Sequence, residues 1–241
     1  MNNSTLQIKF KQRLNKLDSM DYDNIECWQI SEAFNKAQIE WARRQLHGNN
    51  GSRMQPEQSI TTIDDLQVLL VQRDLKLKNL DLFFESLKIP DDYLHFVRVG
   101  GYASSDCCPK RPLSIYQAEE ANADIILSDT HKSPSFEWAE TFCTVMGDKI
   151  RIYSDNKFAV EDATLTYYRK PRAVQILNCI DPANGLAFKA NQTCELKDDI
   201  VEIIIDDAVS ILAETWIVQF SIRETYKTHK EIANDAETTK T

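Results

Sequence analysis

The first forty-eight residues carry apolar side chains every three or four positions, which is the spacing of one face of an α-helix. The first stripe consists of Leu6, Phe10, Leu14 and Leu17, and the second of Ile30, Ala33, Phe34, Ala37 and Trp41. A polar break at residues 21–24 separates the stripes, and Gly48 is a suitable C-terminal stop. The pattern predicts an N-terminal helical pair over residues 1–48.

The pattern changes after this pair. Residues 49–61 are polar and hold two turn signals, which predicts an exposed, mobile loop. Residues 62–194 then hold short runs of β-branched and aromatic residues bounded by Gly, Pro, Asp or Asn, which predicts a β-rich domain. The expected strands are 66–71, 75–82, 93–99, 150–153, 165–169 and 173–177. One inserted helix is expected near residues 118–127, because two acids open it at the favourable end of the helix dipole.

Residues 195–241 return to a helical stripe that begins at Ile200 and continues to Tyr226. Asp198 and Asp199 are suitable N-cap and first-turn residues. The run Ile203–Ile205 favours a strand as the competing interpretation, but the sustained period and the length favour a helix with a frayed tail. The predicted fold class is α+β, with the N-terminal pair and the long C-terminal helix packed together and a sandwich-like β domain between them in sequence.

Composition narrows the function further. The chain of 241 residues carries 28 basic and 37 acidic residues, for a formal charge of −9. The acidic balance opposes a protein that coats nucleic acid, because phosphate contact needs clustered Lys and Arg. The closing segment, residues 195–241, is the most acidic, with five basic and eleven acidic residues. No signal peptide or apolar run of membrane-spanning length is visible, so we expect a protein made in the cytosol, with no membrane partner and six reduced cysteines.

Catalytic and cofactor signatures are absent from the sequence. The four histidines form no zinc spacing, and Gly100-Gly101 is interpreted as a turn because no dinucleotide or phosphate-loop motif follows it. Paired acids such as Asp91-Asp92 are interpreted as caps or strand starts. We therefore expect no enzyme activity, no catalytic residue, no cofactor and no metal.

Basic and aromatic residues are the candidates for an interface. The cluster Arg169-Lys170-Pro171-Arg172 follows Tyr168 at a predicted strand end. The alternative to an interface is a solvated strand end, at which the aliphatic parts of the Arg and Lys side chains cover apolar surface. Arg43-Arg44 and Trp41 lie late in the second predicted helix, where core packing of Trp41 is the alternative. The candidate interface residues are Tyr168, Arg169, Lys170, Arg172, Trp41, Arg43 and Arg44.

Four segments, in this order, resemble head–tail connector proteins of tailed bacteriophages, of the podovirus tail tubular or adaptor type, and most of all the neck ring proteins of crAss-like phages. They are Ile30–Gln38 on the second helix, Ile89-Pro90-Asp91-Asp92-Tyr93-Leu94 at the entry to the β domain, Leu165–Pro171 at a strand end, and Leu196 with Asp198–Val201 before the closing helix. In the second segment Ile89 stands where the pattern has Leu.

The resemblance implies a structural virion protein assembled in the bacterial host cytoplasm. It implies a cyclic homo-oligomer, often a dodecamer, stacked beneath the portal protein or beside other ring and tail proteins, with genomic DNA passing through its lumen unbound. The acidic composition agrees with such a channel, because a wall that repels phosphate lets DNA slide. Two alternatives from other classes remain: a DNA-binding regulator that uses the N-terminal helices, and an unrecognised hydrolase with a carboxylate pair.

Overall fold

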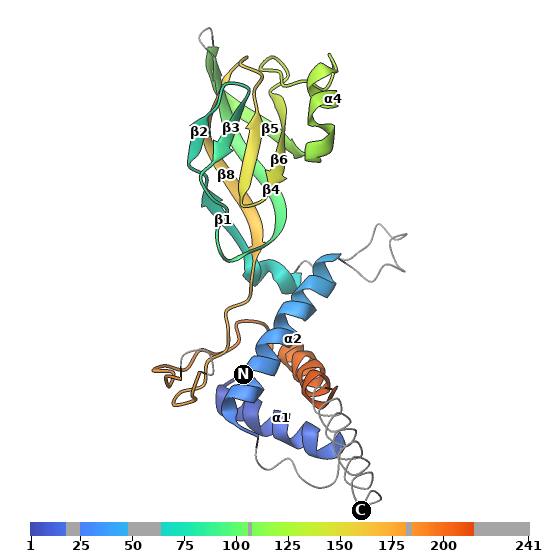
Figure 1. Cartoon of the computed structure of the whole chain (residues 1–241), viewed down its shortest axis with the longest axis vertical. Helices are drawn as coiled ribbons and strands as arrows, with labels where there is room; N and C mark the ends of the chain where they lie inside the picture. The colour runs from blue at the N-terminus through green and yellow to red at the C-terminus, as the bar shows by residue number, and fades with distance from the viewer. Residues whose placement is uncertain (18–24, 48–63, 106–107, 182–184, 215–241) are drawn as a thin grey trace, which may run out of the picture. The chain divides into compact units, whose positions relative to one another are not determined.

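The computed structural model describes residues 1–17, 25–47, 64–105, 108–181 and 185–214 (Figure 1). The chain divides into two compact units. The first, the helical unit, combines residues 1–65 with residues 171–241, and the second, the β unit, is the continuous segment 66–170. Helices and a large curled sheet thus make an α+β protein. The expected loop at 49–61 and the expected tail lie outside the described residues.

The helical unit contains α1 (Asn3–Leu17) and α2 (Cys27–His47), where the two apolar stripes predicted them. Residues 198–214 are also helical, so the helix prevails over the competing strand at Ile203–Ile205. Ile204 and Ile205 are buried while Ile203 is 53% exposed, which is a helical rather than an alternating pattern. Tertiary packing here overrides the β preference of three successive isoleucines.

Residues 171–181 and 185–194 belong to the helical unit and form no extended strand. The strand expected at 173–177 is wrong, because its backbone finds other partners. Asn35 donates from Nδ2 to the carbonyl of Val174 over 3.2 Å and accepts from the Val174 N–H over 2.7 Å. Asn3 donates to the carbonyl of Gln175 over 2.7 Å. Side-chain amides therefore satisfy backbone groups that a strand would have paired.

A disulfide joins Cys27, at the start of α2, to Cys179 in this same segment. The expectation of six reduced thiols is therefore corrected. Nothing in the spacing of the six cysteines indicated the pair, because 152 residues separate its members and only the folded helical unit brings their Cα atoms to 5.8 Å.

The β unit is a mixed sheet with the strand order β1-β8-β4-β5-β6-β7-β3-β2. Every pairing is antiparallel except that of β5 with β6. The strands are β1 (Leu70–Asp74), β2 (Leu77–Asn79), β3 (Phe83–Ser86), β4 (Tyr93–Ser105), β5 (Cys108–Gln117), β6 (Glu140–Met146), β7 (Lys149–Tyr153) and β8 (Ala159–Arg169). The expected strand at 66–71 begins instead with a short 3-10 turn, η2 (Gln67–Leu69).

The two ends of this strand order are joined by the chain itself. Only Leu75 and Lys76 lie between β1 and β2, and a two-residue connection spans about 10 Å at most. Leu75 donates its N–H to Ala163 on β8, while Lys76 accepts from Leu87 just after β3. Residues 70–79 therefore act as one bent strand that pairs with β8 through its first half and with β3 through its second. The sheet therefore curls until it nearly closes (Figure 1). The sequence had instead predicted a sandwich-like domain of two stacked sheets.

The inside of the curl holds the core of the β unit. Its largest fully buried members include Tyr167, Leu165, Ile150 and Ile152. Gly100 and Gly101, interpreted from sequence as a turn, lie within β4 between β5 and β8. A Cβ on Gly101 would lie 3.5 Å from the Ala163 Cα and from Ile115, and the register with β8 shifts here. The glycine pair thus marks a bulge in a crowded strand.

Between β5 and β6 the chain crosses the outer face of the sheet. This crossover contains η3 (Glu120–Asn122) and α4 (Ala123–Ser128), close to the single helix predicted there. Ala123 packs with Phe142 and Tyr153, whose rings stack with centroids 4.4 Å apart. Strand β6 is consequently buried on both faces, with Cys143 turned inward and Phe142 turned toward α4.

Candidate interaction surfaces

The acidic face of the closing helix is engaged within the chain. Glu202 pairs with Lys9 and Arg13 of α1, and Arg13 also reaches Asp206 at 3.1 Å. Asp207 pairs with Arg44 of α2. Hydrogen bonding from Lys9, followed by that from Arg13, lowers the pKa of Glu202. These acids pair with Lys9, Arg13 and Arg44 on the N-terminal helices of the same chain. They are therefore not available as partners for a basic patch on a neighbouring copy.

The basic strand end is divided between the two units. Arg169 and Lys170 close the β unit, whereas Arg172 opens the second part of the helical unit. Arg169 donates to the carbonyl of Val68 at 3.4 Å and to that of Lys170 at 3.2 Å. Arg172 lies 3.9 Å from the carboxylate of Glu195, a side chain that is 15% exposed. All three cations therefore contact groups of their own units, since the exposed Lys170 side chain also donates to the carbonyl of Asp91 over 3.5 Å.

Two of the segments that carry the resemblance meet at this strand end. The Tyr167 hydroxyl donates to Asp92 over 2.8 Å, and the ring of Tyr167 lies 5.8 Å from that of Tyr93. The Lys170 N–H donates to the Asp92 carbonyl over 2.7 Å. Burial, followed by the hydrogen bond to Asp92, raises the pKa of Tyr167 to about 12. The segment 89–94 thus fixes the end of β8, and Asp92 has a structural role that sequence reasoning had described only as a cap or strand start.

The remaining candidates have different environments. Trp41 is 5% exposed, which agrees with the core alternative and removes it from the accessible surface. Arg43 is exposed, and Arg44 is held by Asp207. Tyr168 is half-buried on β8. The positive charge of the arginine pair late in α2 is therefore partly neutralised.

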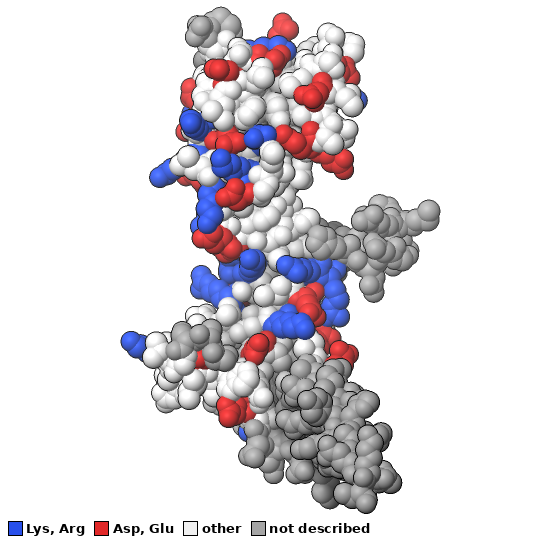
Figure 2. All heavy atoms as spheres, viewed as in Figure 1, with Lys and Arg blue, Asp and Glu red and all other residues white. Residues whose placement is uncertain are grey.

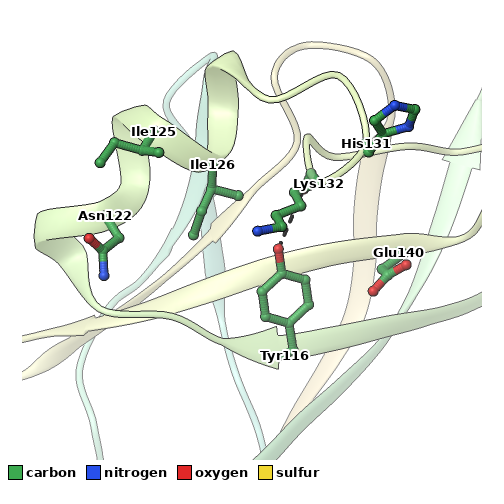
Figure 3. A pocket seen from close by; sticks show the side chains of 7 residues that line it. All are labelled: Tyr116, Asn122, Ile125, Ile126, His131, Lys132 and Glu140. Carbon is green, nitrogen blue, oxygen red and sulfur yellow. Dashed lines mark hydrogen bonds between the residues drawn. The ribbon is translucent and has the colours of Figure 1, made fainter.

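A shallow pocket of about 550 Å³ lies between α4, the loop after it and the outer face of the sheet (Figure 3). Ile125 and Ile126 come from α4, and Tyr116 rises from β5 and donates to the carbonyl of Lys132 over 3.4 Å. Burial raises the pKa of Tyr116. His131 and Glu140 complete the wall, both with exposed side chains. The lining is open to solvent, and it presents no nucleophile held against a base.

Several large apolar side chains remain exposed on the β unit. Trp138 is 81% exposed, Ile125 is 67% exposed and Leu87 is 61% exposed. Exposed apolar side chains of this size, when grouped, mark contact surfaces. Sequence reasoning missed Trp138, since this single tryptophan between Glu137 and Ala139 belongs to no helical or alternating pattern that would predict its burial.

Among the described residues no group of three His, Cys, Asp or Glu side chains could hold a metal ion. None of the helices in the described part combines the length and the apolar character needed to cross a membrane. Acidic and basic side chains lie interspersed over the face shown in Figure 2.

No protein-family model matches this chain, and no curated protein matches it significantly.

Proposed function

We propose that this protein is a structural ring subunit of a tailed-bacteriophage neck. In this role it connects the portal to the tail as a cyclic homo-oligomer, twelve-fold by resemblance, and genomic DNA passes through the ring without specific binding. The subunit would act in the virion after assembly in the host cytoplasm, without catalysis and without a cofactor.

The order of four sequence segments carries the resemblance, and one structural observation supports it. The segment 89–94 and the segment 165–171 are brought into direct contact, with Tyr167 bonded to Asp92 at 2.8 Å. Segments that recur together in one family are expected to share a structural role. Here the contact between the two segments fixes the end of β8, where the chain leaves the β unit.

The helical organisation is consistent with an adaptor. In the proposal, the N-terminal helical pair and the long C-terminal helix pack together as one body, linked by the ion pairs of Glu202, Asp206 and Asp207. The β unit is then a separate body with exposed apolar side chains. A ring subunit needs two different patches, because a cyclic contact joins one patch to another on the next copy.

Mass spectrometry of purified virions and imaging of intact particles test this function. The expected result is the chain in particles at a copy number that matches a ring beneath the portal. Absence of the chain from particles that eject DNA normally would contradict the proposal. The alternatives give other outcomes: retention on duplex DNA at low salt for a regulator, and turnover of ester, phosphate or glycoside substrates for a hydrolase.

A further inference from the structure

The crossover between β5 and β6 is strongly acidic. Residues 118–140, here called the acidic crossover, hold six acidic residues against one lysine. Glu120 is bound by Arg151 at 3.0 Å. Within the described part of the chain no ion pair engages the other five, which are Glu119, Asp124, Asp129, Glu137 and Glu140. The crossover therefore presents an excess of negative charge, which is offset only in part by Lys132 and by Arg111, whose guanidinium donates to the Glu137 carbonyl over 3.2 Å.

The same segment exposes two large apolar side chains, Ile125 on α4 and Trp138 in the turn before β6. That turn is rigid. Ser135 and Glu140 exchange both backbone hydrogen bonds, at 3.0 and 3.1 Å, and Ser135 Oγ accepts from the Trp138 N–H at 3.3 Å. These bonds fix the backbone at Trp138, whose exposed aromatic side chain lies beside acidic groups, which is the composition of an interface anchor.

A second surface has the opposite character. Residues 76–88, here called the basic hairpin, contain β2 and β3. Lys76 and Lys78 are exposed and have no ion-pair partner among the described residues. Glu85, the cross-strand neighbour of Lys78, is already held by Lys149 at 2.7 Å and by Arg151 at 3.0 Å. Asp81 is the remaining acid, so the hairpin and its neighbour β7 have an excess of positive charge.

The basic hairpin also exposes apolar side chains. Leu82 is 48% exposed and Leu87 is 61% exposed. Figure 1 draws β2 and α4 at opposite edges of the β unit, but the two patches adjoin at Arg151, which pairs with Glu120 of the crossover and with Glu85 of the hairpin. One rigid unit thus carries two unlike patches, each part charged and part apolar, with complementary signs.

From this complementarity we infer that the acidic crossover of one copy docks on the basic hairpin of the next copy. The contact is head to tail, since the two patches are different, and repetition around a rotation axis closes a ring. Lys76 and Lys78 would face Asp124 and Glu137, and Trp138 would pack on the exposed leucines. This inference rests on the proposed ring function and specifies the contact that forms it.

A charge swap tests the contact on the full chain. The first variant combines Asp124→Lys with Glu137→Lys, and the second combines Lys76→Glu with Lys78→Glu. Each alone places like charges opposite each other, so self-association measured by sedimentation velocity at low salt should weaken roughly tenfold or more. An equimolar mixture should restore association, because the positive crossover of one variant meets the negative hairpin of the other. Glu32→Lys, an exposed reversal in the helical unit, is the matched control and should leave association unchanged.

The outcomes separate this contact from the ring itself. Wild-type chain that does not associate at the highest soluble concentration, or variants that associate like the wild type, would overturn the docking. A mixture that fails to recover, although circular dichroism shows both variants folded, would overturn it as well. If imaged particles show a ring whose subunits meet elsewhere, the docking is wrong and the proposed function stands. If the swap succeeds but virions lack the protein, the docking stands and the proposed function fails.

Discussion

Asn35 and Val174 form a reciprocal pair in which one side chain replaces a strand neighbour. The Asn35 Nδ2 donates to the Val174 carbonyl at 3.2 Å, while the Asn35 Oδ1 accepts from the Val174 N–H at 2.7 Å. Val174 is 1% exposed, so both backbone groups would be poorly hydrated without this amide. The contact fixes residues 172–175 against α2, together with the bond from Gln38 to the Arg172 carbonyl at 3.1 Å.

Replacing Asn35 with Leu should therefore destabilise the chain by about 2–4 kcal/mol, because it leaves a buried donor and a buried acceptor unsatisfied. Urea denaturation followed by circular dichroism measures the change. Asn15→Leu is the matched control, because the Asn15 side chain is exposed on helix α1. Equal effects from the two substitutions would contradict the role of the amide.

The ion pairs of Glu202 predict a pH dependence. Its pKa is lowered in the folded chain by Lys9 and then Arg13, so this stabilisation is complete above the ordinary value of 4.5 and is lost as pH falls through the lower folded value. Glu202→Gln should cost about 1 kcal/mol near neutral pH, within the range for partly exposed pairs. The difference from wild type should shrink below pH 4.5 in an acid titration of unfolding free energy. A constant difference down to pH 2 would indicate that the loss is packing and not charge.

The disulfide predicts selective thiol labelling. In native, non-reduced protein, Cys108 should react with an alkylating reagent because it is exposed, whereas Cys143 should not, since burial raises its pKa to about 12. Cys27 and Cys179 should label only after reduction and unfolding, which peptide mapping detects. Recovery of alkylated Cys27 from unreduced, unfolded protein would contradict the bridge.

Loss of the bridge should also lower stability. The closed loop spans 152 residues, and the chain-entropy account gives an upper value of about 5 kcal/mol for a loop of this length. The double variant Cys27→Ala with Cys179→Ala should unfold at lower denaturant concentration than the wild type. Cys108→Ser, which alters an exposed thiol, serves as the control.

The basic strand end can now be tested residue by residue. Arg172→Glu should destabilise the helical unit, because it places a second carboxylate beside Glu195, which is 15% exposed. Lys170→Glu should leave the fold intact, because the side chain of Lys170 is exposed. If Lys170 has an assembly role, its reversal should reduce particle yield in a plating assay without a change in melting temperature. Normal yield at every salt concentration would mean that this side chain is a solvated strand end.

Much of the fold follows from local patterns, and the failures have local causes. The helices at 3–17 and 27–47 follow from their apolar stripes. Strand β5 was not predicted, since Pro109 and Pro112 argue against a strand. Strand β5 accommodates Pro112 because it pairs with β6 only from Ser114 to Gln117, so one side of the strand is open there.

The candidate surfaces were less predictable. A charge count identified the acidic closing segment and the basic strand end, but it could not show that Glu202 and Asp207 bind α1 and α2 of the same chain. The Tyr167–Asp92 bond joins residues 75 apart, and its register depends on how β4 and β8 pair. Long-range pairing of this kind leaves no mark in a single sequence.

The bent strand formed by residues 70–79 has a consequence for solubility. Open sheets carry rows of unsatisfied backbone groups at their rims, and those rows recruit further chains into fibrous aggregates. Here both rims are short, five residues in β1 and three in β2, which leaves few free backbone groups to recruit a foreign strand. In the assembly that we propose, copies can then meet through their side chains, and such contacts can be reversed and corrected until the ring forms.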